Sequence, residues 1–297
     1  MTFYFGAHVS VTKLIQSLTE IRDLGGNFAQ IFVSSTFGKY NANLINKYDE
    51  KKDEIRSFLE ENDMKLVIHS PYTLNFGQDM SEVPLKTQLI CDELQVAHNI
   101  GAIGCVIHVG KHLKLDESES EELMHYNISH ILNFIKRNKL NSKLILETAA
   151  GQGTELFVTT DNDISPLANF FNSFSSVQKQ YLKLCIDTCH IFVAGYDIRT
   201  KEQVAQLFDD FAEHDILQHI ALIHFNDANK DYATRVDRHA AIGHGYIGVK
   251  GLCAVLKQAR KYRIPCVLET PGDSYTGEIP WIKENFVDKK KKLVKKK

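Results

Sequence analysis

Short apolar runs alternate with longer amphipathic stretches along almost the whole chain. Eight runs have the length and apolar content of buried strands, and we expect these strands at residues 3–7, 28–33, 65–68, 102–107, 143–146, 181–186, 220–223 and 265–268. Between them, apolar residues recur every three or four positions, which predicts helices over 12–24, 44–62, 81–100, 119–139, 163–178, 201–213 and 249–262. Apolar strands joined by helical crossovers are typical of a parallel sheet buried on both faces.

The number of strand–helix repeats favours one arrangement of that sheet. Eight strands joined by helical crossovers predict an α/β fold in which the strands close into a (β/α)8 TIM barrel, with an open doubly wound sheet as the alternative. No linker or change of composition interrupts residues 1–288, so we expect a single domain there. Residues 289–297, KKKKLVKKK, form a lysine-rich tail that we expect to be disordered.

Ionisable residues follow six successive predicted strands: His69, His108, Glu147, Asp187, His224 and Glu269. The carboxyl ends of parallel barrel strands surround one mouth, so these side chains are expected to face one another. Burying so many ionisable groups without partners would be costly, and bound metal ions would remove that cost. Imidazole and carboxylate ligands suit zinc, manganese or iron, and we do not count Cys185 or Cys189 as ligands.

A second group of candidate ligands lies outside the strand ends. His190 follows Asp187 in the segment CIDTCHIFVAGYD, where we predict a loop, and Asp237 and His239 are two residues apart, so that they project the same way from an extended segment. The three side chains predict another metal site. The residues alone leave open that Asp187 only caps a helix and that Asp237 and His239 form a surface pair.

The distribution of charge limits the possible partners. Seven of the 35 basic residues lie in the tail, which leaves 28 basic and 37 acidic residues in 1–288. A body this acidic is a poor nucleic-acid binder unless bound cations offset its charge. The tail fits a phosphate contact, a nuclear address or an aid to solubility, and the sequence does not choose among them.

The chain also lacks features of membrane and secreted proteins. No apolar run approaches the ~20 residues of a membrane span, the N-terminus does not read as a signal peptide, and the spacing of the six cysteines suggests no disulfide framework. We therefore expect a soluble intracellular protein, cytoplasmic or nuclear. The glycines of 243–248 do not directly follow a strand, so they predict a tight loop and not a dinucleotide fingerprint.

Seven motifs taken together resemble a known family. They are GAHVS at 6–10, HSPYTLN at 69–75, LETAAGQG at 146–153, CIDTCHIFVAGYD at 185–197, HFNDA at 224–228, RVDRH at 235–239 and LET at 268–270. The chain resembles the endonuclease IV family of zinc-dependent apurinic/apyrimidinic (AP) endonucleases of base excision repair. The resemblance extends from Phe5 to about Trp281 and implies a TIM barrel.

The resemblance also implies a set of metal ligands. Three zinc ions are expected, with manganese left open at one or more sites. The first would take His69, His108 and Glu147; the second would share Glu147 and add Asp187, His224 and Glu269; the third would take His190, Asp237 and His239. All nine positions hold a residue of the type that the family requires.

The implied reaction is hydrolysis of the phosphodiester on the 5′ side of an abasic site in double-stranded DNA. It leaves a 3′-hydroxyl and a 5′-deoxyribose phosphate, and repair of damaged 3′ ends is expected beside it. Glu147 and Glu269 are the implied catalytic residues: Glu147 bridges two ions, and Glu269 orients the attacking water or accepts its proton. We expect a monomer, with no membrane partner and no nucleotide cofactor.

The implied DNA contacts are less regular than the ligands. Tyr72 matches a tyrosine that the family inserts into DNA, although a loop aromatic packed on the barrel rim is the alternative. Thr73 replaces the family's apolar wedge, and Phe37 or Lys39 stands where an arginine is frequent. Asn226, Arg238 and the backbone at 151–153 are the expected phosphate contacts.

Two other functions stay open at this point. A metal-dependent sugar isomerase or epimerase would share the barrel, but it would leave His190, Asp237 and His239 without a purpose. A non-catalytic, zinc-containing binder of DNA lesions would not need Glu147 and Glu269. A metal count and a nicking assay separate these readings.

Overall fold

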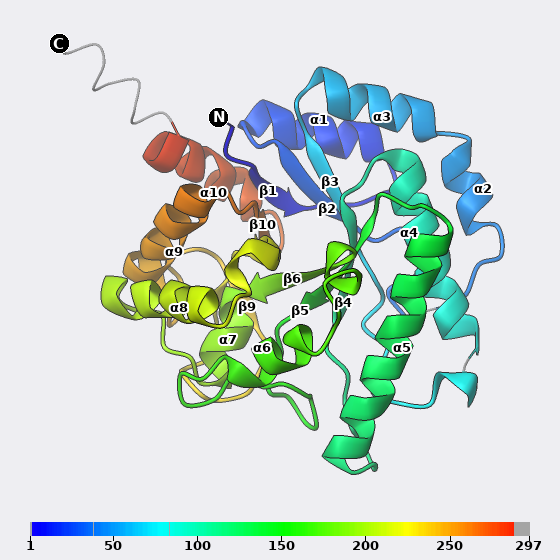
Figure 1. Cartoon of the computed structure of the whole chain (residues 1–297). Coiled ribbons are helices and arrows are strands. Elements are labelled where there is room, and N and C mark those ends of the chain that lie inside the picture. Colours follow the sequence, from blue (N-terminus) through cyan, green and yellow to red (C-terminus); the bar gives the residue numbers. More distant parts are fainter. Residues whose placement is uncertain (1, 38, 83, 288–297) are drawn as a thin grey trace.

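The computed structural model describes residues 2–37, 39–82 and 84–287 (Figure 1). The predicted tail at 289–297 lies outside the described residues. Eight parallel strands close into a barrel in the order β1-β10-β7-β6-β5-β4-β3-β2. Their bounds are Phe5–His8 (β1), Phe28–Ile31 (β2), Lys65–His69 (β3), Gly104–His108 (β4), Lys143–Glu147 (β5), Leu182–Asp187 (β6), Ile220–His224 (β7) and Cys266–Leu268 (β10). The predicted closed barrel is confirmed, and the open sheet is excluded.

Helices surround this barrel on its outside (Figure 1). They are α1 (Leu14–Leu24), α2 (Leu44–Asp49), α3 (Lys52–Glu61), α4 (Pro84–Ile100), α5 (Glu117–Arg137), α6 (Ser165–Asn172), α7 (Thr188–Ala194), α8 (Lys201–Glu213), α9 (Gly248–Tyr262) and α10 (Tyr275–Ile282). A short antiparallel pair, β8 (Asp227–Ala228) and β9 (His239–Ala240), lies beyond β7. Within the described residues, we find no helix with the length and apolar content to cross a membrane.

Three predicted segments differ from the structure. The expected helix 44–62 is two helices, because residues 49–54 are all charged and give no apolar contact that would hold the helix together. The expected helix 163–178 stops at Asn172. The predicted loop after Asp187 is wrong: it is helix α7, which is buried on all sides and therefore shows no amphipathic pattern.

The core has two layers. The larger one fills the space between the barrel and the helices. The smaller one fills the barrel interior with one residue from each of seven strands: Phe28, Val67, Val106, Ile145, Cys185, Leu222 and Val267. This interior layer forms the floor of the barrel mouth.

Candidate metal centre

The period of two along a strand determines which side chains reach the mouth. The residue two positions after each interior residue points to the same face of its strand, one layer nearer the carboxyl end. These residues are Gln30, His69, His108, Glu147, Asp187, His224 and Glu269. The structure thus brings the six predicted strand-end residues together and adds Gln30.

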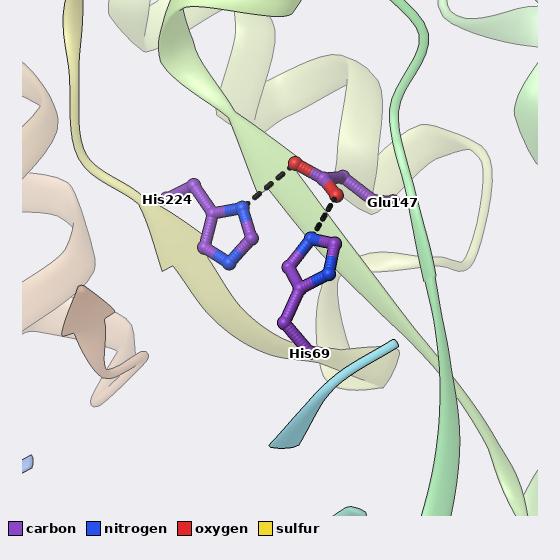
Figure 2. Close-up of side chains that lie close together, drawn as sticks. All are labelled: His69, Glu147 and His224. Carbon is purple, nitrogen blue, oxygen red and sulfur yellow. Dashed lines mark hydrogen bonds and ion pairs between the residues drawn. The ribbon is translucent and has the colours of Figure 1, made fainter. Parts of the chain in front are cut away.

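Glu147 is the centre of this cluster and is 1% exposed. Its Oε2 lies 3.2 Å from His69 Nε2 and 3.5 Å from His108 Nε2, and its Oε1 lies 2.7 Å from His224 Nδ1. Figure 2 shows His69 and His224 on the two sides of this carboxylate. Burial alone would raise the pKa of Glu147, but the adjacent imidazoles of His224 and His108 hold that pKa well below its usual value.

The two oxygens of Asp187 have separate tasks. Oδ1 accepts hydrogen bonds from the backbone N–H groups of Cys189 and His190, at 2.6 and 3.0 Å, and so caps α7. Oδ2 faces the mouth, 3.6 Å from His239 Nε2 and 3.8 Å from His224 Nδ1. Asp187 is therefore a helix cap and a candidate ligand at the same time.

His190, Asp237 and His239 meet beside this cluster, as their spacing predicts. The Asp237 carboxylate lies 3.3 Å from His190 Nε2 and 3.3 Å from His239 Nε2. Burial alone would lower the pKa of His239, but Asp187 and Asp237 raise it to about 9. The predicted surface pair is thus joined to the mouth by a buried histidine of α7.

Hydrogen bonds to backbone carbonyl groups orient three of the imidazoles. In each case Nδ1 contacts a backbone carbonyl oxygen. The His69 Nδ1 lies 2.7 Å from the Ser70 carbonyl, the His190 Nδ1 lies 2.8 Å from the Thr148 carbonyl, and the His239 Nδ1 lies 3.1 Å from the Glu269 carbonyl. A carbonyl can only accept, so each Nδ1 carries the proton and donates it. In the neutral imidazole the lone pair is then on Nε2, which faces the mouth, as in histidines that bind metals.

Three imidazole nitrogens at the mouth make ion-pair contacts of 3.3 to 3.5 Å but no hydrogen bond in the part of the chain that the structure describes, as fits ligands of a metal ion. Nε2 of His108, His190 and His239 is buried and has no hydrogen-bond partner among the described residues. Leaving buried polar atoms in this state costs free energy, and a cation at the mouth would remove the cost. Candidate ligand atoms converge to within 4.8 Å of one another in the sets His69–Glu147–His224, Glu147–Asp187–His224–Glu269 and Asp187–His190–His239.

Cys189, which the sequence analysis left out of the ligands, lies at the edge of this centre. Its sulfur belongs to a fourth convergent set with Asp237 and His239. Burial and the Asp187 carboxylate raise the pKa of this thiol, and the sulfur contacts the Arg238 carbonyl at 3.6 Å. His190 already provides a third ligand beside Asp237 and His239, so this site does not need the Cys189 sulfur and Cys189 stays outside the proposed ligand set.

Gln30 was missed by the sequence analysis. Its amide nitrogen donates to Glu269 Oε1 at 2.6 Å, and its carbonyl oxygen accepts from His224 Nε2 at 2.8 Å. The second contact directs His224 Nδ1 toward the carboxylates. The sequence did contain a signal for this role, because Gln30 is a polar residue at an inward-facing position of an otherwise apolar strand.

Removing this amide is expected to weaken metal binding. Gln30→Ala leaves His224 and Glu269 unoriented, so metal affinity should fall by roughly 10- to 100-fold, the usual effect of losing an outer-shell partner. Titration of the metal-free protein with zinc against a competing chelator measures this change. Gln16→Ala, on the exposed face of α1, is the control. An unchanged zinc affinity in Gln30→Ala would contradict the assigned role.

The predicted DNA contacts fall into two groups. Phe37, Lys39, Tyr72, Thr73 and Arg238 are exposed. A cavity of about 340 Å³ lies over the ligands, with Tyr72, Arg238 and Pro271 in its wall. The Tyr72 ring lies 5.6 Å from the rings of both His69 and His108.

Asn226 is not placed to make the phosphate contact that was predicted for it. It is fully buried beneath the mouth. Its amide nitrogen donates to Asp187 Oδ2 at 2.8 Å, and its oxygen accepts from the Glu269 backbone N–H at 2.8 Å. Asn226 therefore orients two ligands and has no free polar group for DNA.

Comparisons with known proteins agree with this architecture. Residues 18–288 match the profile of a family described as Xylose isomerase-like TIM barrel. Putative endonuclease 4 of Acanthamoeba polyphaga mimivirus is 30% identical over 94% of this chain and 88% of its own. Probable endonuclease 4 of Petrotoga mobilis is 31% identical over 95% and 96%. Endonuclease IV of Thermus thermophilus shares the fold, with a TM-score of 0.74 at 22% identity over 96% of this chain and 99% of that one. By these matches over nearly its whole length, the chain belongs to the endonuclease IV family of xylose isomerase-like TIM barrels.

Proposed function

We propose that this protein is a zinc-dependent AP endonuclease that hydrolyses the DNA phosphodiester on the 5′ side of an abasic site. The products are a 3′-hydroxyl and a 5′-deoxyribose phosphate, and the same site repairs damaged 3′ ends. One observation carries the proposal: nine His, Asp and Glu side chains converge on one mouth, where three buried imidazole nitrogens make no hydrogen bond within the described part of the chain. The names of the related endonucleases support DNA as the substrate.

The nine residues divide into three zinc sites in this proposal. His69, His108 and Glu147 hold the first ion; Glu147, Asp187, His224 and Glu269 hold the second; His190, Asp237 and His239 hold the third. When bound, such ions supply an activated water near neutral pH and positive charge for the phosphate in the transition state. Manganese at one or more of the sites is compatible with the same ligands.

The carboxylates of Glu147 and Glu269 have different roles in this proposal. Glu147 contacts imidazoles on both of its oxygens and so holds the first two sites at a fixed separation. Glu269 is 13% exposed and lines the open cavity. Burial alone would raise the pKa of Glu269, but His224 helps to lower it to about 2. Glu269 is therefore ionised at neutral pH and able to orient the attacking water or accept its proton.

The exposed residues predicted as DNA contacts meet the lesion in this proposal. Tyr72 and Phe37, which are 60% and 81% exposed, present rings that can enter the space left by the missing base. Thr73 adds a smaller wedge, and Lys39 and Arg238 offer positive charge to phosphates. Three divalent cations would bring the formal charge of residues 1–288 from −9 to about −3 and ease the approach of double-stranded DNA. The protein is proposed to act as a monomer.

The lysine-rich tail is expected to change DNA affinity and not chemistry. Deleting 289–297 removes seven positive charges, so the Kd for DNA at low salt should rise and the salt dependence of binding should become shallower. The single-turnover rate on saturating substrate should stay near that of the full chain. Fluorescence anisotropy across a salt series, with quenched-flow incision, measures both. A collapsed single-turnover rate would show that the tail belongs to the active site.

A sugar isomerase or epimerase on the same barrel is the second candidate. The description of the matching family favours it, since that description refers to xylose isomerase. Such an enzyme needs one or two metal ions, and the convergence of His190, Asp237 and His239 is then unexplained.

Incision of an abasic-site analogue tests the proposed function. The substrate is a duplex oligonucleotide with one tetrahydrofuran residue, which blocks β-elimination, and the zinc content of the same preparation is determined. A cut that leaves a 3′-hydroxyl, with about three zinc ions per chain, is expected. Three zinc ions without a cut would favour the lesion binder, and one or two metal ions without a cut would favour a sugar substrate.

A further inference from the structure

A buried acid on α4 is not among the candidate metal ligands described above. Glu93 is 0% exposed, and it interrupts the buried apolar face of α4. Burial raises the pKa of this carboxyl to about 7, although hydrogen bonds from Ser34 and Ser70 act in the opposite direction. Enclosing a carboxyl at this depth costs free energy, so its hydrogen bonds need an explanation.

The two oxygens of Glu93 bind two different loops. Oε1 accepts a hydrogen bond from the Ser34 hydroxyl, in the loop after β2, and Oε2 accepts one from the Ser70 hydroxyl at 2.6 Å, directly after β3. The first loop carries Phe37, and the second carries Tyr72. One carboxyl thus joins the bases of the two loops that present the exposed rings.

Ring contacts continue this connection to the mouth. The Phe32 ring, at the start of the first loop, lies 5.4 Å from the Tyr72 ring and 5.3 Å from the His69 ring. The base of the Phe37 loop is therefore bound to α4 through Ser34 and packs against Tyr72 through Phe32.

We propose that Glu93 is a positioning residue for lesion recognition, which holds the Phe37 and Tyr72 loops at one fixed separation. The inference rests on the proposed function, because it assumes that both loops contact the DNA. Without the Glu93 carboxyl, the two loops are no longer joined to each other at their bases. Binding of the lesion should then suffer more than the chemical step, because His69 contacts the backbone carbonyl of Ser70 and not the hydroxyl that binds Glu93.

Steady-state kinetics on the tetrahydrofuran duplex test the proposal. Glu93→Ala should raise KM by ~10-fold or more and leave kcat within about twofold of wild type, with unchanged zinc content. Glu93→Gln should restore most of the affinity, because its amide can accept from one serine and donate to the other. Stopped-flow fluorescence of 2-aminopurine next to the lesion should show less unstacking in Glu93→Ala.

Serine variants test the same link without removing the buried acid. Ser34→Ala and Ser70→Ala should each raise KM, and Glu93→Ala combined with Ser34→Ala should be no worse than Glu93→Ala alone. Ser142→Ala is the matched control, because this buried hydroxyl also donates to α4, to the Leu94 carbonyl at 2.8 Å, but precedes β5 at the other end of the barrel. If Glu93→Ala does not fold, these variants decide the question.

The possible failures are distinguishable. A wild-type enzyme that does not incise the duplex would overturn the proposed function and this inference with it. An active wild type with unchanged KM in Glu93→Ala or in both serine variants would overturn the positioning role alone. A loss of zinc or of kcat at unchanged KM would overturn it too, because Glu93 would then support the metal centre.

Discussion

Replacing Glu147 with glutamine is expected to abolish incision while the barrel stays folded. The carboxylate contacts His69, His108 and His224 at 2.7 to 3.5 Å, so it is the shared element of two proposed zinc sites. An amide of the same shape has one oxygen instead of two and no negative charge. The single-turnover rate on the tetrahydrofuran duplex should fall on the order of 10³-fold or more.

The matched control for Glu147→Gln is Asp210→Asn. Asp210 lies on α8, outside the mouth, where it accepts hydrogen bonds from Tyr196 and Gln206. The same change from carboxylate to amide should there leave incision near the wild-type rate. Metal analysis completes the comparison, because Glu147→Gln should also retain less zinc. A rate within tenfold of wild type would show that Glu147 does not bridge the ions.

Removing the metal is expected to cost both activity and stability. A ligand present at 1,000 times its Kd stabilises the folded state by about 4 kcal/mol. At roughly 2 °C per kcal/mol for a chain of this size, the Tm should fall by ~8 °C on chelation. Zinc should restore both properties, and magnesium, which prefers oxygen ligands, should not. Incision by a protein shown to be metal-free would contradict the proposed mechanism.

The loss of Tm on chelation is expected to grow as the pH rises. In the metal-free chain, the pKa of His239 is raised from 6.5 to about 9, so its ion pairs stabilise fully below pH 6.5 and are lost as the pH rises through about 9. The pKa of Glu269 is lowered from 4.5 to about 2, so its contribution is present above pH 4.5 and is lost as the pH falls through about 2. Both contributions are fully present between pH 4.5 and pH 6.5, so the metal-free chain should be most stable in that range.

Zinc binding has the opposite pH dependence, because it needs neutral imidazoles and becomes stronger as protons leave. The difference in Tm between the zinc-loaded and metal-free protein should thus widen from pH 6.5 to pH 9. Calorimetry of both forms in a pH series measures it. A constant difference would mean that the histidines do not exchange protons for metal.

The barrel and the candidate ligands were predictable from local patterns. Apolar strands of three to six residues, separated by amphipathic helices, favour a parallel sheet, because its helical crossovers cover both faces of each strand. His69, His108 and Glu147 directly end their strands, so the parallel topology alone brings them to one mouth.

The orientation and support of these side chains depended on contacts between distant parts of the chain. Gln30 contacts Glu269 across 239 positions, and no local pattern predicts such a pair. Asn226 has the residue type of a phosphate contact, but burial makes it a support for Asp187 and Glu269. Helix α7 lacks an amphipathic pattern because every side is buried. The sequence by itself specifies which side chains reach the mouth, through the period of its strands. Burial and long-range hydrogen bonds exist only once the barrel has closed. They determine which atom of each side chain faces a metal and which residues hold it there.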